Sequence, residues 1–289
     1  MAYNNSIDLN VTGVVTASGT GTWTGSAVTQ YEVVLGDAAN ALTNVSGTGT
    51  LNQYLASNGA AAAPTWKTLP GAASFSINVQ TFTTSGTYTP TANMVYAIIE
   101  VVGGGGGGGA VDNPTASQGA LGDGGGAGGY ARLTASSATI GASQTVTVGA
   151  AGIGGTAGPN AGTAGGTTSF GTLVQATGGQ GGAAGISQAF PGAQPTAGGV
   201  GSSGNLNANG APSIPSIGLA SSVAFTAGGG SSLWGGAGLS YPFTTSVNGS
   251  SASNYGSGGS GGGSILSTNN ASGGNGSAGI CIVTEYIFI

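Results

Sequence analysis

The chain has 289 residues, of which 63 are glycine, two are Lys or Arg, seven are Asp or Glu, and none is histidine. Two basic residues cannot neutralise a phosphate backbone or hold an anionic membrane surface, so nucleic-acid binding and polybasic membrane anchoring are excluded. The lack of histidine also removes Ser-His-Asp and Cys-His catalysis and most transition-metal sites, so we expect no catalytic residues, no metal and no cofactor.

The glycine content bears on whether the chain is ordered. Disordered chains combine low hydrophobicity with high charge, whereas here 39% of residues are hydrophobic and 3% are charged. We therefore expect an ordered protein. Fixing a glycine costs about 0.5–1 kcal/mol more than fixing an alanine, so dense backbone hydrogen bonding and oligomerisation are the expected sources of compensating stability.

Residues 1–74 form one compositional unit, which we interpret as a β-rich oligomerisation segment. Val- and Thr-rich stretches broken by glycine at residues 9–16 and 26–35 are typical of short strands, and the pattern continues to about residue 59. Large apolar residues are too few for a monomeric core. We therefore expect several chains to associate about an axis.

Residues 75–289 form a second unit, predicted to be a glycine-rich domain built on a small sheet. The stretch 94–102 is apolar on both faces, which predicts a central strand covered from both sides, and residues 278–289 repeat that pattern. No helix is predicted. The remaining predicted strands are 74–83, 86–89, 130–135, 144–148, 167–170 and 173–177.

A run of seven glycines follows directly on the apolar stretch that ends at Val102: Gly103, Gly104, Gly105, Gly106, Gly107, Gly108 and Gly109. Such a run cannot sustain a helix and gives a strand nothing to pack. It can adopt the extended polyproline II geometry of about 3.1 Å per residue, which has no internal hydrogen bonds and so must bond to neighbouring segments.

Glycine tracts recur almost to the C-terminus, with little strand signal between residues 183 and 277. We therefore predict an all-β fold with a bundle of packed polyglycine II rods, whose rods and variable loops occupy residues 178–277. The further tracts are 122–129, 149–166, 178–185, 197–204, 227–230, 235–238, 256–263 and 273–279.

Paired carboxylates of the glycosidase type are the only common catalytic chemistry left by this composition. Glu100 and Glu285 would approach each other if their two long strands are neighbours. The alternative, which we favour, is that each faces one side of a sheet or pairs with Arg132. Asp112 and Asp123 flank glycine tracts and are expected to bond the local backbone in turns.

The single cysteine and the N-terminus carry little functional signal. Cys281 lies in an apolar run, which is typical of a buried, inert thiol. The first six residues lack the basic start and apolar core of a signal peptide, and no apolar stretch reaches the roughly 20 residues that span a bilayer. We expect a chain made in a host cytoplasm without membrane insertion.

Aromatic residues in the poorly patterned region are the candidates for binding. They are Phe190, Trp234, Tyr241, Phe243 and Tyr255, which lie among small polar residues where no strand pattern would bury them. Exposed Trp and Tyr are favoured at binding hot spots. The alternative is that these rings cap the ends of the rods and shield backbone hydrogen bonds, and both interpretations stay open.

Several motifs carry a resemblance to known proteins. An apolar strand enters polyglycine at residues 98–105, and further motifs follow at 128–132, 144–149, 165–171 and 279–285. Residues 75–180 and 273–289 thereby resemble the glycine-rich domain of bacteriophage tail-fibre and receptor-binding proteins. Residues 41–66 look like a module common in the shafts of such fibres.

The resemblance implies a homotrimeric virion protein with a distal polyglycine II adhesin whose variable loops attach to a host-surface protein or polysaccharide. It also implies that another tail or virion protein holds the N-terminus. No motif matches residues 183–272, so no receptor contact carries over. The main alternative is a structural subunit of an extracellular or virion filament without receptor specificity. A tailspike-like depolymerase and an ice-binding protein are further alternatives.

Overall fold

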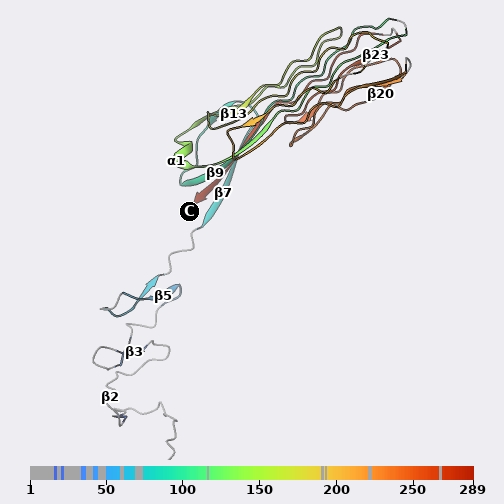
Figure 1. Cartoon of the computed structure of the whole chain (residues 1–289). Coiled ribbons are helices and arrows are strands. Elements are labelled where there is room, and N and C mark those ends of the chain that lie inside the picture. The colour runs from blue at the N-terminus through green and yellow to red at the C-terminus, as the bar shows by residue number, and fades with distance from the viewer. Residues whose placement is uncertain are drawn as a thin grey trace, which may run out of the picture. The chain divides into compact units, whose positions relative to one another are not determined.

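The computed structural model describes the chain except for residues 1–15, 18–20, 23–33, 37–41, 45–49, 59–61, 69–73, 116, 190, 191, 193, 221, 222, 267 and 268. The chain divides into two compact units, Met1–Ser74 and Phe75–Ile289 (Figure 1). The described residues are nearly all β structure. Their one helix is α1 (Ser137–Ile140), with four residues.

The described residues of the N-terminal unit form three separate pairs of antiparallel strands. The predicted strands at 9–16 and 26–35 lie mostly outside the described residues. A lone two-stranded hairpin is at best marginally stable, so these pairs are weak elements when taken one at a time. The pairs are β1 (Thr16–Ala17) with β2 (Gly21–Thr22), β3 (Val34–Gly36) with β4 (Leu42–Asn44), and β5 (Gln53–Ala56) with β6 (Thr65–Thr68).

The second unit begins with two five-stranded antiparallel sheets. The first has the order β16 (Leu206–Ala208), β11 (Tyr130–Ser136), β9 (Met94–Val102), β24 (Ile280–Phe288), β7 (Phe75–Phe82). The second has the order β15 (Gly201–Ser202), β14 (Val174–Ala176), β13 (Thr168–Phe170), β12 (Gln144–Thr147), β8 (Gly86–Tyr88). The two sheets share one buried core and so form a sandwich.

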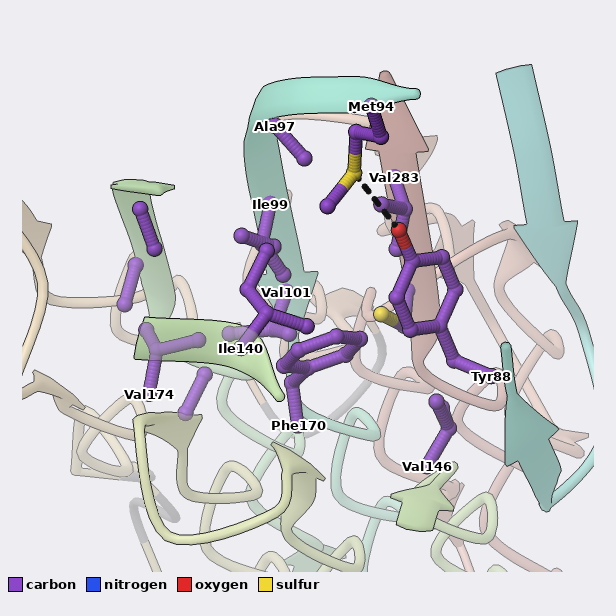
Figure 2. Close-up of a cluster of buried hydrophobic side chains, with 14 residues drawn as sticks. Tyr88, Met94, Ala97, Ile99, Val101, Ile140, Val146, Phe170, Val174 and Val283 are labelled. Carbon is purple, nitrogen blue, oxygen red and sulfur yellow. Dashed lines mark hydrogen bonds between the residues drawn. The ribbon is translucent and has the colours of Figure 1, made fainter. Parts of the chain in front are cut away.

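Figure 2 shows this core, in which side chains of the two sheets meet. Ile99 and Val101 alternate along β9 toward the second sheet, and Phe170 of β13 lies against Tyr88 of β8 with ring centroids 5.1 Å apart. Ile140 of α1 fills one side. The prediction that residues 94–102 form a central strand is confirmed, because β9 lies between β11 and β24.

One expectation about these elements needs correction. Only one face of β9 is covered by the second sheet, because Tyr96 and Ile98 on the other face remain half-buried. The expectation of essentially no α-helix is confirmed in the described residues, where α1 has four residues. It begins after Ser136, whose Oγ accepts a hydrogen bond from the Thr139 N–H, and ends at Gly141 with φ of 76°.

The glycine run continues β9 as an extended segment, residues 103–111, which we call the central segment. Its backbone N–H groups donate in rotation to three different segments. Gly103 donates to the carbonyl of Gly129, Gly104 to Gly166 and Gly105 to Ser277, and the cycle then repeats through Val111 with N···O distances of 2.8–3.0 Å. Within each neighbour, the residue number of the acceptor falls as that of the donor rises. These neighbours are therefore antiparallel to the central segment; they are residues 123–129, 160–166 and 271–277.

The carbonyl groups of the central segment accept bonds from three other segments, 152–158, 179–185 and 256–262. Gly179 and Gly182 donate to Gly104 and Gly107, an interval of three residues on both segments. Donor and acceptor positions rise together, so these neighbours are parallel to the central segment. The central segment thus bonds sideways to six segments in a three-residue repeat, to which the bond from the Ala271 N–H to the Val111 carbonyl is added at its end.

Short strands close the far end of this bundle, where Figure 1 shows β20 and β23 away from β9 and β13. The expectation of almost no strands between residues 183 and 277 was therefore wrong in detail, because strands of two to four residues leave no periodic signal. The remaining sheets are β17 (Ile217–Ala220), β18 (Val223–Phe225), β20 (Pro242–Phe243); β10 (Gly119–Leu121), β23 (Gly263–Ile265), β21 (Ser246–Val247); and β19 (Gly235–Gly236) with β22 (Ser253–Asn254).

Candidate binding surface at the far end of the glycine-rich unit

The central segment sets the distance between the sandwich and the far end. An ideal Cβ built on Gly105, Gly106 or Gly107 would lie 1.9–2.2 Å from a carbonyl oxygen of a parallel neighbour. No side chain fits there without moving backbone, so the close approach requires glycine. The residues from Gly103 to Val111 span roughly 25 Å at about 3.1 Å per residue. They therefore carry the loops beyond Val111 well away from the sandwich.

The far end has its own apolar core, made where the sheet β17–β18–β20 packs on the sheet β10–β23–β21. Leu121, Ala224, Phe243 and Ile265 are buried there, with Val247 packed against them. We call β17–β18–β20 the distal sheet. Its inward face is fixed by this core, which leaves its other face on the surface.

The outward face of the distal sheet carries exposed apolar side chains. Ile217 of β17 lies directly across from Phe225 of β18, and these two residues are 54% and 38% exposed. Leu219 and Val223 are also exposed. We call these four residues the distal apolar surface. Because Ala224 between Val223 and Phe225 is buried, the alternation of β18 aims its two larger side chains outward.

Comparison with known protein families matches residues 78–286 to a family described as a glycine-rich domain. The chain belongs to this glycine-rich domain family. A search of curated proteins finds no match. The matched residues include nearly all of the sandwich, the central segment with its six neighbours and the distal sheet, so the distal apolar surface lies within the glycine-rich domain.

The four aromatic candidates among the described residues do not come together in the glycine-rich domain. Tyr241 is 40% exposed at the far end, where its carbonyl accepts a bond from the Thr226 N–H and its N–H donates to the Thr226 hydroxyl. Phe243 is a correction: it is 7% exposed in the core beneath the distal sheet, so its ring offers no surface. Phe190 lies outside the described residues.

Trp234 and Tyr255 lie at the sandwich end of the bundle instead. The Ser232 hydroxyl donates to the backbone carbonyl of Tyr255 and accepts from the backbone N–H of Trp234. These two bonds hold the two aromatic residues near each other. Gly256 follows Tyr255 in the chain and lies against Val102 at the end of β9. A Cβ added to Gly256 would be 2.3 Å from the Val102 side chain. The bundle thus separates these residues from Tyr241.

The residues that sequence reasoning missed are the apolar ones of the distal sheet. Ile217 and Leu219 alternate with small residues, and so do Val223 and Phe225. Two such alternations in succession favour a hairpin, but each covers only three residues, which is too few to establish a period.

The carboxylates Glu100 and Glu285 do not form a catalytic pair. They lie on the neighbouring strands β9 and β24 but on opposite faces of the first sheet. Glu100, across from Arg132 in the strand pairing, faces outward and accepts a 2.6 Å hydrogen bond from the Tyr130 hydroxyl. Burial is the larger cause and the hydrogen bond to Glu100 the smaller cause that together raise the pKa of Tyr130 to about 12.

Glu285 is a fully buried structural anchor in the glycine-rich domain. Its carboxylate accepts bonds from the Tyr88 hydroxyl at 2.6 Å, the Thr91 hydroxyl at 2.6 Å, the Thr91 N–H at 2.9 Å, the Asn78 amide at 2.7 Å and the Gln80 amide at 3.3 Å. Burial by itself raises the pKa of Glu285, but these bonds outweigh it and lower the pKa to about 2. The ionised carboxylate therefore ties β24 to β7 and to the β8–β9 connection.

The remaining titratable candidates are also structural. Asp112 bonds the adjacent Asn113 N–H, as expected for a turn. Asp123 instead accepts from Gln194 in a distant segment, so its predicted local role is corrected. Cys281 is buried, and burial raises its pKa to about 12, which leaves the thiol protonated and inert.

No three His, Cys, Asp or Glu side chains in the described part of the chain gather closely enough to hold a metal ion. Among the same residues, no helix has the length and apolar character needed to cross a membrane.

Proposed function

We propose that the chain is a receptor-binding adhesin of a phage tail fibre and attaches to a host surface through the distal apolar surface. The observation that carries this proposal is the exposed row formed by Ile217, Leu219, Val223 and Phe225 on a sheet held rigidly from below. Contiguous exposed apolar side chains on a monomer mark an interaction site.

The bundle supports the proposal by acting as a stiff arm. Its rods are, in this proposal, polyglycine II helices, because the sideways bonds repeat every three residues and link each rod to its neighbours. A rigid arm presents the distal apolar surface without losing conformational entropy on binding, which favours affinity. Tyr241, exposed at the same end, is a second contact.

Attachment in this proposal is multivalent and non-covalent. The N-terminal unit forms a homotrimer and joins another tail or virion protein, so each fibre presents three distal surfaces. Linking weak sites raises the overall avidity by a factor on the order of 10² to 10⁴ without tight single contacts. The rival proposal, a filament subunit without receptor specificity, would instead give open-ended polymers in electron micrographs.

The test uses the full chain with Ile217→Ser and Leu219→Ser combined, measured for adsorption to the bacterial strain on which the fibre-bearing phage grows. We expect at least a tenfold loss, since both side chains leave the proposed contact. The matched control is Leu233→Ser, because Leu233 is equally apolar and exposed but next to Trp234 at the sandwich end. Equal adsorption by the double variant and the control would contradict the proposal. Treating the cells with protease or periodate then distinguishes a protein receptor from a polysaccharide.

A further inference from the structure

The first sheet has an outward face that the sandwich does not cover. Alternation along the strands sends one set of side chains into the core and the other set outward. We call the outward apolar set the outer face; its residues are Phe75, Ile77 and Val79 of β7, Tyr96 and Ile98 of β9, and Ile282, Tyr286 and Phe288 of β24. The three β7 residues are all more than half exposed.

Residues of the outer face lie in rows across the three strands. Ile77, Tyr286 and Tyr96 are consecutive partners in the strand pairing, and the two tyrosine rings stack with centroids 4.4 Å apart. Phe75 pairs with Phe288 edge to face at 5.7 Å. The rings are thus held in place before any partner arrives, which lowers the entropy lost on association.

The charges around the outer face permit contact with an identical surface. The eight residues that define it are uncharged, and the charged side chains next to it on the same sheet are Glu100 and Arg132, directly opposite each other at the β9–β11 pairing. Two such faces therefore meet without like-charge repulsion. Neutral, aromatic-rich surface of this kind is typical of the core of a subunit interface.

The preceding part of the chain identifies the occupant. The hairpin β5–β6 leaves Leu51 91% exposed, and a single hairpin of this kind needs a partner to be stable. Only the short connection between Thr68 and Phe75 separates that hairpin from β7, the first strand of the outer face. Copies joined through their N-terminal units would hold their outer faces at millimolar effective concentration, on the order expected for short linkers.

We propose that the outer face is covered by a second copy of this chain, so that subunits associate through the first sheet as well as through the N-terminal unit. The contact is distinct from the distal apolar surface and does not depend on what that surface binds.

The test compares the reactivity of two introduced thiols in the purified full chain. Val79→Cys places a thiol on the outer face, and Ile217→Cys places one on the distal apolar surface; the residues they replace are 55% and 54% exposed in a single chain. If a second copy covers the outer face, maleimide labelling followed by intact-mass spectrometry is at least tenfold slower at Val79→Cys. The buried Cys281 reports unfolding in both variants, because it reacts only when the sandwich opens.

Adding Ile77→Asp to Val79→Cys should restore fast labelling, since the interface cannot bury an unpaired carboxylate, while Cys281 stays unlabelled. Equal labelling rates at the two single sites in the purified protein would overturn the proposal. So would a single-chain mass of 26.9 kDa by light scattering. Fast labelling of Val79→Cys in purified protein but slow labelling in virions would assign the outer face to another virion protein and also overturn it.

Discussion

Gly105 and Ser257 approach so closely that a Cβ on the glycine would lie 1.9 Å from the serine carbonyl oxygen. Neither residue is near the other in sequence, and neither has a side chain in the contact. The same relationship recurs at every glycine from Gly103 to Gly109, each against a backbone carbonyl. The bundle is therefore held together by backbone hydrogen bonds between segments that are too close for a side chain. Unlike an ordinary apolar core, it is sensitive to the addition of a single methyl group.

A single methyl group in the central segment should be strongly destabilising. Gly106→Ala would place Cβ 2.0 Å from the Gln180 carbonyl oxygen, and we expect a loss of about 3 kcal/mol or more in the free energy of unfolding. Gly86→Ala is the matched control, because there the nearest atoms are ring carbons of Phe82 at 3.8 Å. Thermal unfolding followed by circular dichroism measures both; similar midpoints for the two variants would contradict the packed bundle.

Backbone amides of the central segment should exchange slowly with deuterium. Every N–H from Gly103 to Val111 donates to another segment inside the bundle, so exchange requires opening of several rods together. We expect protection at least 10³-fold above a random-coil glycine peptide, measured by exchange and mass spectrometry. Exchange at random-coil speed would show that the ladder of sideways bonds does not persist in solution.

Stability should fall in acid through Glu285. Its folded pKa of about 2 lies below the ordinary value of 4.5 for a glutamate, so the folded state binds fewer protons and the stabilising contribution of Glu285 is complete above about pH 4.5. That contribution is lost as pH falls from about 4.5 to about 2. Glu285→Gln should unfold at a lower temperature than the unsubstituted chain at pH 7. Its thermal midpoint should also change less with pH between about 4.5 and about 2.

The control for this prediction is Asp112→Asn, an exposed turn residue whose substitution should leave the profile unchanged. Thermal midpoints measured at intervals from pH 2 to pH 7 decide the comparison. If the thermal midpoints of Glu285→Gln and of the unsubstituted chain fell in parallel as the pH is lowered, the acid dependence would come from other carboxylates.

Removing the ring beneath the distal sheet should loosen the far end alone. Phe243→Ala leaves a cavity among Leu121, Ala224 and Ile265, at a cost of about 3–5 kcal/mol for a fully packed ring. Amide exchange should accelerate in β18 and β23 and stay unchanged in β9. Faster exchange throughout the sandwich would contradict the separation of the two cores.

Tyr241 and Trp234 should differ in their effect on adsorption. Tyr241 lies with the distal sheet, whereas Trp234 lies at the sandwich end, so Tyr241→Ala should lower adsorption about tenfold, the equivalent of 1.4 kcal/mol. Trp234→Ala should change it less than twofold. Adsorption of labelled full chain to the host strain gives both values. A larger effect of Trp234→Ala would move the contact surface to the other end of the bundle.

Strand positions were largely predictable because long strands carry their own pattern. The apolar run of β9 and its end at Val102 coincide with the prediction, and β7, β11, β12 and β24 differ from it by two residues or fewer at each end. The glycine run also predicted that the chain must bond sideways. Both inferences depend only on local chemistry, namely side-chain alternation and the absence of side chains.

The candidate surface was less predictable, because exposure depends on contacts between distant residues. Phe243 and Tyr241 have similar neighbours in the chain, yet Phe243 is buried against Leu121 and Ile265 while Tyr241 is exposed. Short strands such as β18 and β20 have too few residues for a period to show. The apolar residues of β17 and β18 are exposed because the core with Phe243 and Ile265 covers only the opposite face of their sheet.

The amino-acid sequence by itself determined that this protein is a sparsely charged, glycine-rich β protein with extended segments that must pair with one another. The tertiary structure alone decided which segments pair, so that Gly103, Gly104 and Gly105 donate to Gly129, Gly166 and Ser277. The reason is physical: bonds between side-chain-free backbones are chemically alike, and nothing in a glycine run distinguishes one partner from another. The sandwich at one end and the distal core at the other, where side chains do differ, set the register of the segments between them.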